Sequence, residues 1–206
     1  MASSKKNKDF KDPKLELYRR ILRQIWEDGI VTSDEYAIME KIRDGLNITL
    51  EEHLELESEV YMNLARSQFE KTHHKEAMEL YDKALKQDPD NELAWMNKGF
   101  HLQSLGRAEE AIKCFDKALN LNPKNPQAMV VKGCAYDNLG KHKDAVKAYK
   151  QALKFTPDDE WVFYNLGMAY FHIGDNAKAT GAFKQALKLK PDFSGPMKYL
   201  EMLSQQ

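Results

Sequence analysis

The sequence predicts an all-α protein in which pairs of helices repeat along the chain. Ten glycines and seven prolines among 206 residues are fewer helix breakers than soluble proteins usually contain. Four of the prolines recur at one fixed spacing, and the apolar residues between them follow the i, i+3, i+4, i+7 pattern of a helix face. Together these observations favour long helices joined by short turns.

The charge balance argues against a general affinity for nucleic acid. The chain carries 31 basic and 32 acidic side chains, a net charge of -1, whereas binding to a phosphate backbone needs an excess of positive charge. Hydrophobic residues make up 42% of the chain, which is enough for a packed core. We therefore expect a folded protein that does not bind nucleic acid.

No segment of the sequence is expected to span a membrane. The longest apolar stretch, residues 161–173, is interrupted by Asn165 and His172 and is shorter than the roughly 18 residues that a span requires. The amino terminus has lysines but no apolar segment of a secretory signal. Cys114 and Cys134 lack the spacing of a zinc or redox motif. A cytoplasmic protein with reduced thiols is the resulting expectation.

The repeat has a period of 34 residues. Pro89, Pro123, Pro157 and Pro191 are separated by this interval, and three such coincidences have a chance probability of about 1 in 10,000. Three further columns share the period: Ala77, Ala111, Ala145 and Ala179; Tyr81, Phe115, Tyr149 and Phe183; and Ala84, Ala118, Ala152 and Ala186.

Each repeat is predicted to contain two helices. Gly106, Gly140 and Gly174 stand where the first helix ends, because glycine readily adopts the positive φ of a helix C-terminus. The second helix ends before the proline. The alanines, with Gly99, Gly133 and Gly167, leave room where helices cross, and the aromatic residues are expected to fill the gap between neighbouring units. One unit alone would expose its apolar face, so stacking is required.

These offsets of small, aromatic and proline residues resemble the tetratricopeptide repeat family. The resemblance implies a right-handed α-α superhelix, a solenoid with four repeats at residues 58–91, 92–125, 126–159 and 160–193 and a capping helix at 194–206. The first repeat departs most, with Ala65 at the glycine position and THHK at the glycine turn. Lys98 and Lys132 also replace the usual leucine. We expect these departures to leave the fold intact.

A separate helical module is predicted at residues 13–57, after a disordered tail at residues 1–12. Its first helix has an apolar face from Leu15 to Trp26 and is expected to end at Gly29. Two capping-box patterns, Thr32 with Glu35 and Thr49 with Glu52, open a second helix that ends at Gly45 and a third helix. No breaker follows before Pro89, so the third helix should run into the first repeat.

The turns of this module are weakly similar to those of TerB-like modules or calcium-free EF-hand pairs. An EF-hand alignment leaves only Asp28, Thr32 and Glu35 as oxygen ligands in the first loop, and the second loop has no aspartate pair. The adjacent His73 and His74 point in different directions and have no thiol nearby. No metal site and no cofactor are therefore predicted. No catalytic motif is present either, so the chain is not expected to be an enzyme.

In the family, one face of the first helix of each repeat lines a concave groove that binds a peptide. The resemblance places an unusually apolar set of residues on this face. They are Met62, Arg66 and Phe69; Leu93, Met96, Asn97 and Phe100; Val130 and Cys134; and Trp161, Tyr164, Asn165, Met168 and Phe171. Exposed apolar patches of this size mark binding sites, although the same residues can instead pack against neighbouring helices.

A chaperone-tail-binding class of the family holds a terminal carboxylate with lysine, asparagine and arginine side chains. The matching positions here contain Met62, Arg66, Asn97, Gln127 and Val131, of which only Asn97 fits. A register one repeat later retains only Asn165. Binding of acidic chaperone tails is therefore disfavoured.

The sequence thus predicts a non-catalytic adaptor whose groove binds a peptide or amphipathic helix of another protein. An alternative is autoinhibition or self-assembly, in which the amino-terminal module or a second copy fills the groove. A metal-binding or nucleic-acid function of the amino-terminal module is a third possibility. Residues 13–57 carry six basic and eleven acidic side chains, a net charge of -5 that disfavours nucleic acid.

Overall fold

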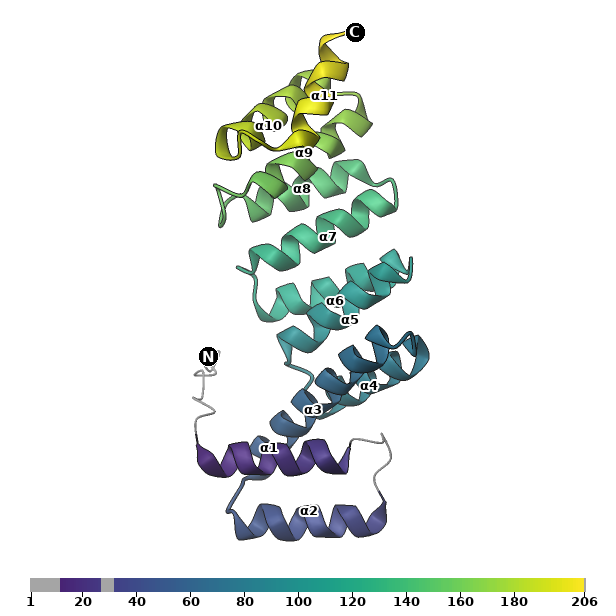
Figure 1. Cartoon of the computed structure of the whole chain (residues 1–206), viewed down its shortest axis with the longest axis vertical. Coiled ribbons are helices and arrows are strands. Elements are labelled where there is room, and N and C mark those ends of the chain that lie inside the picture. Colours follow the sequence, from purple (N-terminus) through teal and green to yellow (C-terminus); the bar gives the residue numbers. More distant parts are fainter. Residues whose placement is uncertain (1–11, 27–31, 206) are drawn as a thin grey trace. The chain divides into compact units, whose positions relative to one another are not determined.

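The computed structural model describes residues 12–26 and 32–205. Every regular element in these residues is a helix, which confirms the all-α prediction, and the helices are numbered α1 to α11 (Figure 1). The chain divides into two compact units, Met1–Ala94 and Trp95–Gln206. The boundary falls inside α5 and places the first repeat in the same unit as the amino-terminal module.

In its described residues, 12–26 and 32–94, the first unit contains four complete helices. They are α1 (Pro13–Ile25), α2 (Ser33–Gly45), α3 (Leu50–Glu70) and α4 (His74–Gln87). Helix α1 packs against α2 and α3, and α3 packs against α4. The structure confirms both capping boxes, because Thr32 and Thr49 exchange side-chain and backbone hydrogen bonds with Glu35 and Glu52. The third helix runs without a break into the first repeat, as predicted. The predicted stop at Gly29 lies outside the described residues, as do residues 1–11 of the predicted tail.

The core of the first unit combines aromatic rings with a buried carboxylate. Trp26 packs edge-on against Tyr61, with ring centroids 4.4 Å apart, and also contacts Tyr36 at 6.1 Å. Glu57 is only 1% exposed. The Tyr61 hydroxyl donates a hydrogen bond of 3.4 Å to its carboxylate, and burial raises the pKa of Glu57.

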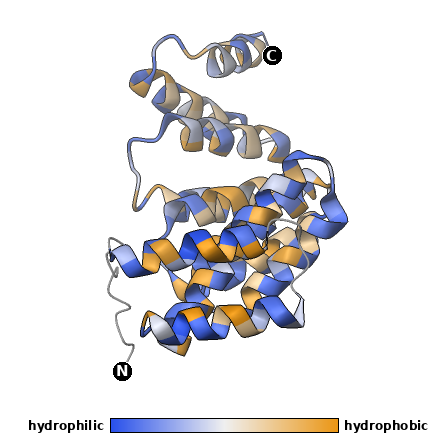
Figure 2. Cartoon of the chain, turned by 60° about the horizontal axis from the view of Figure 1, so that its bottom comes forward, coloured by the Kyte–Doolittle hydropathy of each residue, from blue (hydrophilic) through white to orange (hydrophobic). Residues whose placement is uncertain are grey.

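The second unit is a stack of helices that pack mainly against their neighbours in the sequence. After the end of α5 (Glu92–Ser104) come α6 (Ala108–Leu121), α7 (Pro126–Asn138), α8 (His142–Ala152), α9 (Glu160–Ile173), α10 (Asn176–Leu189) and α11 (Ser194–Ser204). Figure 2 shows hydrophobic and hydrophilic residues on different parts of the same helices, as expected where one face of each helix packs into a core.

The turns within the repeats follow the predicted glycine rule. Gly106, Gly140 and Gly174 have φ angles of 74°, 68° and 84°. In the first repeat Thr72 occupies the equivalent place and also has a positive φ, 66°. This conformation is strained for a β-branched residue, so the first repeat keeps the turn at some cost in stability.

The packing inside each repeat depends on a small residue under an aromatic ring. A Cβ atom added to Gly133 would lie 2.5 Å from Cε1 of Tyr149, and one added to Gly167 would lie 2.5 Å from Cε1 of Phe183. Gly99 has the same relation to Phe115. The sequence analysis expected these rings to fill gaps between neighbouring units. They lie directly against the first helix of their own repeat, where glycine leaves the space that they need. Phe183 also stacks on Tyr199 of α11, with ring centroids 5.4 Å apart.

One departure from the family pattern is explained by an ion pair. Lys132 on α7 lies 2.5 Å from the Asp116 carboxylate on α6. Its ammonium group also lies 5.6 Å from the centre of the Tyr136 ring, within the range of a cation–π interaction. A lysine at this position therefore links two helices through its charge where the family pattern has leucine.

We predict that Gly133→Ala destabilises the second unit, because the new methyl group would collide with the Tyr149 ring. Overpacking of this kind costs about 2 kcal/mol. Gly181 is exposed on α10, and a Cβ atom added to it would meet nothing within 4 Å, so Gly181→Ala should stabilise the helix by about 1 kcal/mol. Thermal unfolding of both variants checks the pair. Equal shifts in Tm would contradict the proposed glycine–ring contact.

We also predict that Glu57→Gln removes a pH-dependent loss of stability. Burial raises the pKa of Glu57 in the folded protein above its ordinary 4.5. The contribution of the protonated carboxyl group to stability is therefore fully present below pH 4.5 and is lost as the pH rises through the pKa of the folded state. As the pH rises through this range, the free energy of unfolding of the variant should therefore increase by on the order of 1 kcal/mol relative to that of the natural protein.

Urea unfolding from pH 4 to pH 8 measures the difference, with the exposed Glu51→Gln as the control. The pKa of His53 is lowered, mainly by burial, so its own contribution is lost as the pH falls below its ordinary 6.5. Because His53 Nε2 lies 3.9 Å from the Glu57 carboxylate, the comparison is repeated with His53→Gln in every protein, which removes the titration of His53. A pH profile of Glu57→Gln parallel to that of the natural protein would refute the prediction.

Candidate functional site

The predicted site residues of the second unit lie on α5, α7 and α9, the first helices of their repeats. On α9 they are spaced so that they share one face of the helix. Trp161 at its start is 53% exposed, and Tyr164, Met168 and Phe171 follow as half-buried side chains. The Asp159 carboxylate accepts hydrogen bonds from the backbone amides of Trp161 and Val162, so a cap fixes the helix start and the position of the tryptophan.

A second large apolar side chain is exposed on α5. Phe100 is 56% exposed, whereas Met96, one turn earlier, is 9% exposed and lies in the core. Asn97 is half-buried between them. Of the predicted residues on this helix within the second unit, Phe100 therefore offers the largest apolar contact area.

The predicted site residues of α7 and α9 lie next to each other. The Asn165 side-chain amide on α9 lies 3.9 Å from the sulfur of Cys134 on α7. Val130, one turn before Cys134, packs partly against the core of the unit. Burial raises the pKa of the Cys134 thiol, which therefore remains protonated and behaves as a small apolar group. We call Phe100, Val130, Cys134, Trp161, Tyr164, Met168 and Phe171 the apolar surface.

The carboxyl-terminal helix α11 covers part of this surface. Tyr199 on α11 contacts Phe171 at a ring-centroid distance of 5.3 Å and Tyr164 at 6.4 Å. It also stacks on Phe183 of α10 at 5.4 Å. Tyr164 and Phe171 thus pack against α11 as well as contributing to the surface. The sequence analysis identified the capping helix but assigned it no contact with these residues.

Trp161 has its own neighbours at the start of α11. Its ring lies 4.5 Å from Phe193, measured between centroids, and the Lys190 ammonium group lies 5.8 Å from the Trp161 ring centre. These contacts hold the indole in place while more than half of its surface remains exposed. A large, ordered and exposed aromatic side chain is typical of an interface anchor.

A polar cluster that the sequence analysis did not identify as a site lies on α7, α8 and α9. Asp137 accepts a hydrogen bond of 2.8 Å from the Tyr149 hydroxyl and lies 2.9 Å from Nδ1 of His142. The His142 ring stacks on His172 with centroids 4.8 Å apart. In the sequence, this cluster could have been recognised from the positions of Asp137 and His142 on either side of one turn. The cluster gives the apolar surface a polar neighbour that can donate and accept hydrogen bonds.

The predicted site residues of the first unit differ in how far they are exposed to solvent. Met62 is buried, Arg66 is exposed and Phe69 is half-buried against the His74 ring, 4.6 Å away. Leu93, at the beginning of α5, is 56% exposed. Met62 therefore supports the interior and presents no open surface. The second unit contains the larger group of exposed and half-buried apolar residues.

Other kinds of site find little support in the described residues. Within ranges 12–26 and 32–205, no group of three or more histidine, cysteine or acidic side chains is placed to hold a metal ion. No helix in these ranges is both long and apolar enough to span a membrane.

Paired helices, glycine turns and glycine–aromatic contacts at a constant interval define an α-helical repeat protein. Residues 59–194 match the family model described as the Psidin N-terminal TPR repeats region. This match covers more than half of the chain. The protein therefore belongs to this tetratricopeptide-repeat family, as the sequence analysis expected.

Several solved structures have a similar fold. YrrB, described as a TPR protein with an unusual peptide-binding site, has a TM-score of 0.65 at 20% identity over 87% of this chain and 97% of that chain. MamA from Desulfovibrio magneticus RS-1 has a TM-score of 0.64 at 19% identity, over 88% and 98%. The first TPR of Spaghetti (RPAP3), solved with the HSP90 peptide SRMEEVD, reaches 0.55 at 24% identity, over 57% and 94%. No curated protein matches the sequence.

We predict that Tyr199→Ala loosens α11, because the ring connects α11 to both α9 and α10. Loss of a half-buried aromatic side chain should cost about 2 kcal/mol. Met197→Ala is the matched control, since Met197 is an exposed residue of the same helix. Chemical unfolding gives the stability, and hydrogen exchange shows where it is lost. Unchanged exchange in α11 would contradict the assigned role of Tyr199.

Proposed function

We propose that the protein is a non-catalytic adaptor that binds an amphipathic helix or extended apolar segment of another protein on the apolar surface. The observation that carries the proposal is the exposure of Phe100 and Trp161 on first helices of the second unit. Half-buried apolar side chains of α7 and α9 belong to the same set. A partner that covers these side chains removes apolar area from water, which is the main source of affinity in such interfaces.

The chemistry of the surface favours an apolar ligand over an acidic chaperone tail. Its sulfur-containing and aromatic side chains are polarisable and suit apolar groups of varied shape. The positions expected to hold a terminal carboxylate contain Met62, Gln127 and Val131 instead of the needed lysine and arginine residues, and Asn165 is engaged with Cys134. The HSP90 peptide of the RPAP3 structure is thus a poor guide to the ligand of this chain.

The polar cluster supplies directional contacts beside the apolar ones. Asp137 already accepts hydrogen bonds from its neighbours, and the rings of His142 and His172 stack beside it. Imidazole nitrogens can donate or accept hydrogen bonds. A bound segment with a polar group at the matching position would be fixed in register, whereas apolar contacts alone permit sliding. In this proposal Phe100 and Trp161 provide affinity and the cluster provides orientation.

We predict that Phe100→Ala and Trp161→Ala each weaken partner binding by about 2 kcal/mol or more, as is typical of aromatic anchors. Proteins retained from a lysate by the natural chain and by each variant are compared by quantitative mass spectrometry. The affinity of a retained partner is then measured by titration calorimetry. Phe155→Ala is the control, because Phe155 is an exposed aromatic residue after α8 that lies outside the surface.

Partner affinity that is unchanged in both variants would refute the proposal. Self-assembly is the alternative, in which a second copy of the protein covers the apolar surface. Light scattering distinguishes this case from binding of a different protein. If Phe100→Ala and Trp161→Ala both lower the mass of the natural protein in solution, a second copy covers the surface. If the mass stays that of a single chain in all variants, the surface is available to a different protein.

A further inference from the structure

The first unit contains an open cleft between α1 and α3 with a volume of about 580 Å³. It is lined by Arg20, Arg23 and Gln24 of α1 and by Val60, Asn63 and Leu64 of α3. It lies in the other unit from the apolar surface and shares no residue with it. We call it the α1/α3 cleft.

The polar lining of the α1/α3 cleft is rich in hydrogen-bond donors. Each guanidinium group of Arg20 and Arg23 has five N–H donors and no acceptor, and the amides of Gln24 and Asn63 add further donors. Among residues 12–26 and 32–205, no acidic side chain lines the cleft. A ligand that satisfies these donors must itself bring acceptors, and the planar guanidinium groups match a carboxylate particularly well.

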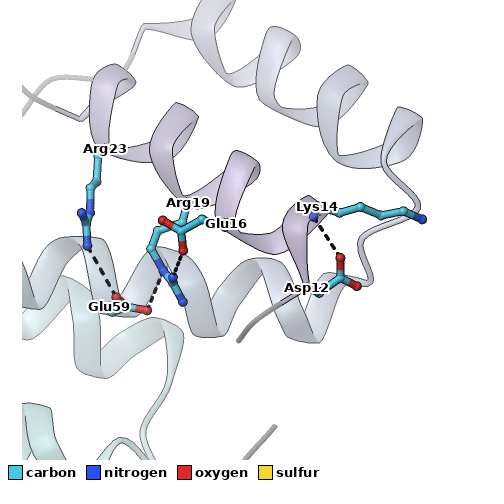
Figure 3. Close-up of polar contacts among 6 residues, drawn as sticks. All are labelled: Asp12, Lys14, Glu16, Arg19, Arg23 and Glu59. Atoms are coloured by element: carbon cyan, nitrogen blue, oxygen red, sulfur yellow. Dashed lines mark hydrogen bonds and ion pairs between the residues drawn. The ribbon is translucent and has the colours of Figure 1, made fainter. Parts of the chain in front are cut away.

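The edge of the cleft already shows how a carboxylate is held there. Glu59 of α3 lies 3.1 Å from Nε of Arg19 and 3.8 Å from Nη2 of Arg23, and Figure 3 shows both arginines reaching from α1 towards it. Arg19 also pairs with Glu16 on its own helix. The Arg23 side chain remains 54% exposed, so much of its guanidinium group is open to a second acceptor.

The charge of Arg20 indicates one negative group on the ligand. Arg19 and Arg23 already contact the Glu59 carboxylate, whereas Arg20 lines the cleft and is exposed to solvent. Its positive charge is therefore available to a ligand. A single carboxylate balances it, whereas a polyanion would be repelled by the net charge of -5 on residues 13–57.

The remaining lining gives the ligand an apolar part. Of the two apolar lining residues, Val60 is fully buried and supports the floor of the cleft, whereas the half-buried Leu64 offers accessible apolar surface. We propose that the α1/α3 cleft is a second binding site, which takes a peptide segment of another protein with one acidic residue beside an aliphatic one. The carboxylate meets Arg20 and Arg23, and the aliphatic side chain packs against Leu64.

The test uses a short peptide with blocked termini, acetyl-Gly-Ser-Leu-Glu-Leu-Ser-Gly-amide, whose only charge is the glutamate. It is titrated into the full-length ¹⁵N-labelled protein while the side-chain Nε–H signals of Arg20 and Arg23 and the amide signals of Gln24 and Asn63 are followed by NMR. The same peptide with glutamine in place of glutamate is the ligand control. Sodium acetate and sodium phosphate at equal concentration distinguish a peptide from a free anion.

We expect saturable shifts of these four side chains with the glutamate peptide and at least about fivefold weaker binding of the glutamine peptide, because the charge-assisted bonds are lost. Arg20→Ala should weaken binding to a similar extent. Arg20 is chosen because it is exposed, so the variant should fold. Lys14→Ala removes an exposed positive charge of the same helix and should leave the affinity unchanged.

Three results would overturn the proposal: no shift of these side chains at millimolar peptide, equal affinity for the glutamine peptide, or equal shifts with phosphate alone. Equal losses in Arg20→Ala and Lys14→Ala would show general charge attraction and would also overturn it. Because the cleft is separate from Phe100 and Trp161, none of these results bears on the adaptor proposal for the second unit.

Discussion

The fold of the second unit depends on one contact, a glycine of the first helix beneath an aromatic ring of the second helix. Gly99, Gly133 and Gly167 each lie where a Cβ atom would collide with such a ring. The absence of a side chain lets the two helices approach closely, and the ring fills the space that remains. The buried aromatic rings then form the centre around which the alanines of neighbouring helices pack.

This contact also determines which residues are left for binding. The glycine side of each first helix faces its partner helix, so residues elsewhere on the helix surface contact the next repeat or solvent. Phe100 and Trp161 remain largely exposed on such surfaces, while Tyr164 and Phe171 are shared with Tyr199 of the last helix. The scaffold and the apolar surface are thus two sides of the same helices, and a change in helix packing would alter both.

The first unit uses a different kind of interior. Its amino-terminal helices are attached to the first repeat through aromatic contacts of Trp26, a buried carboxylate at Glu57 and ion pairs between α1 and Glu59. Buried polar groups of this kind contribute less to net stability than apolar packing but require specific partners. The raised pKa of Glu57 predicts a stability that depends on pH, and α1 and α3 leave an arginine-lined cleft at the surface of the unit.

The sequence by itself determined the helical repeat, the glycine turns, both capping boxes and the continuous third helix, because these depend on residues close together in the chain. Only the tertiary structure decided that Met62 and Met96 are buried, that α11 covers part of Tyr164 and Phe171, and that α1 and α3 enclose a cleft. A helical pattern shows that a side chain lies on an apolar face. Whether that face is covered depends on neighbouring helices, whose approach is set by side-chain volumes distant in the sequence.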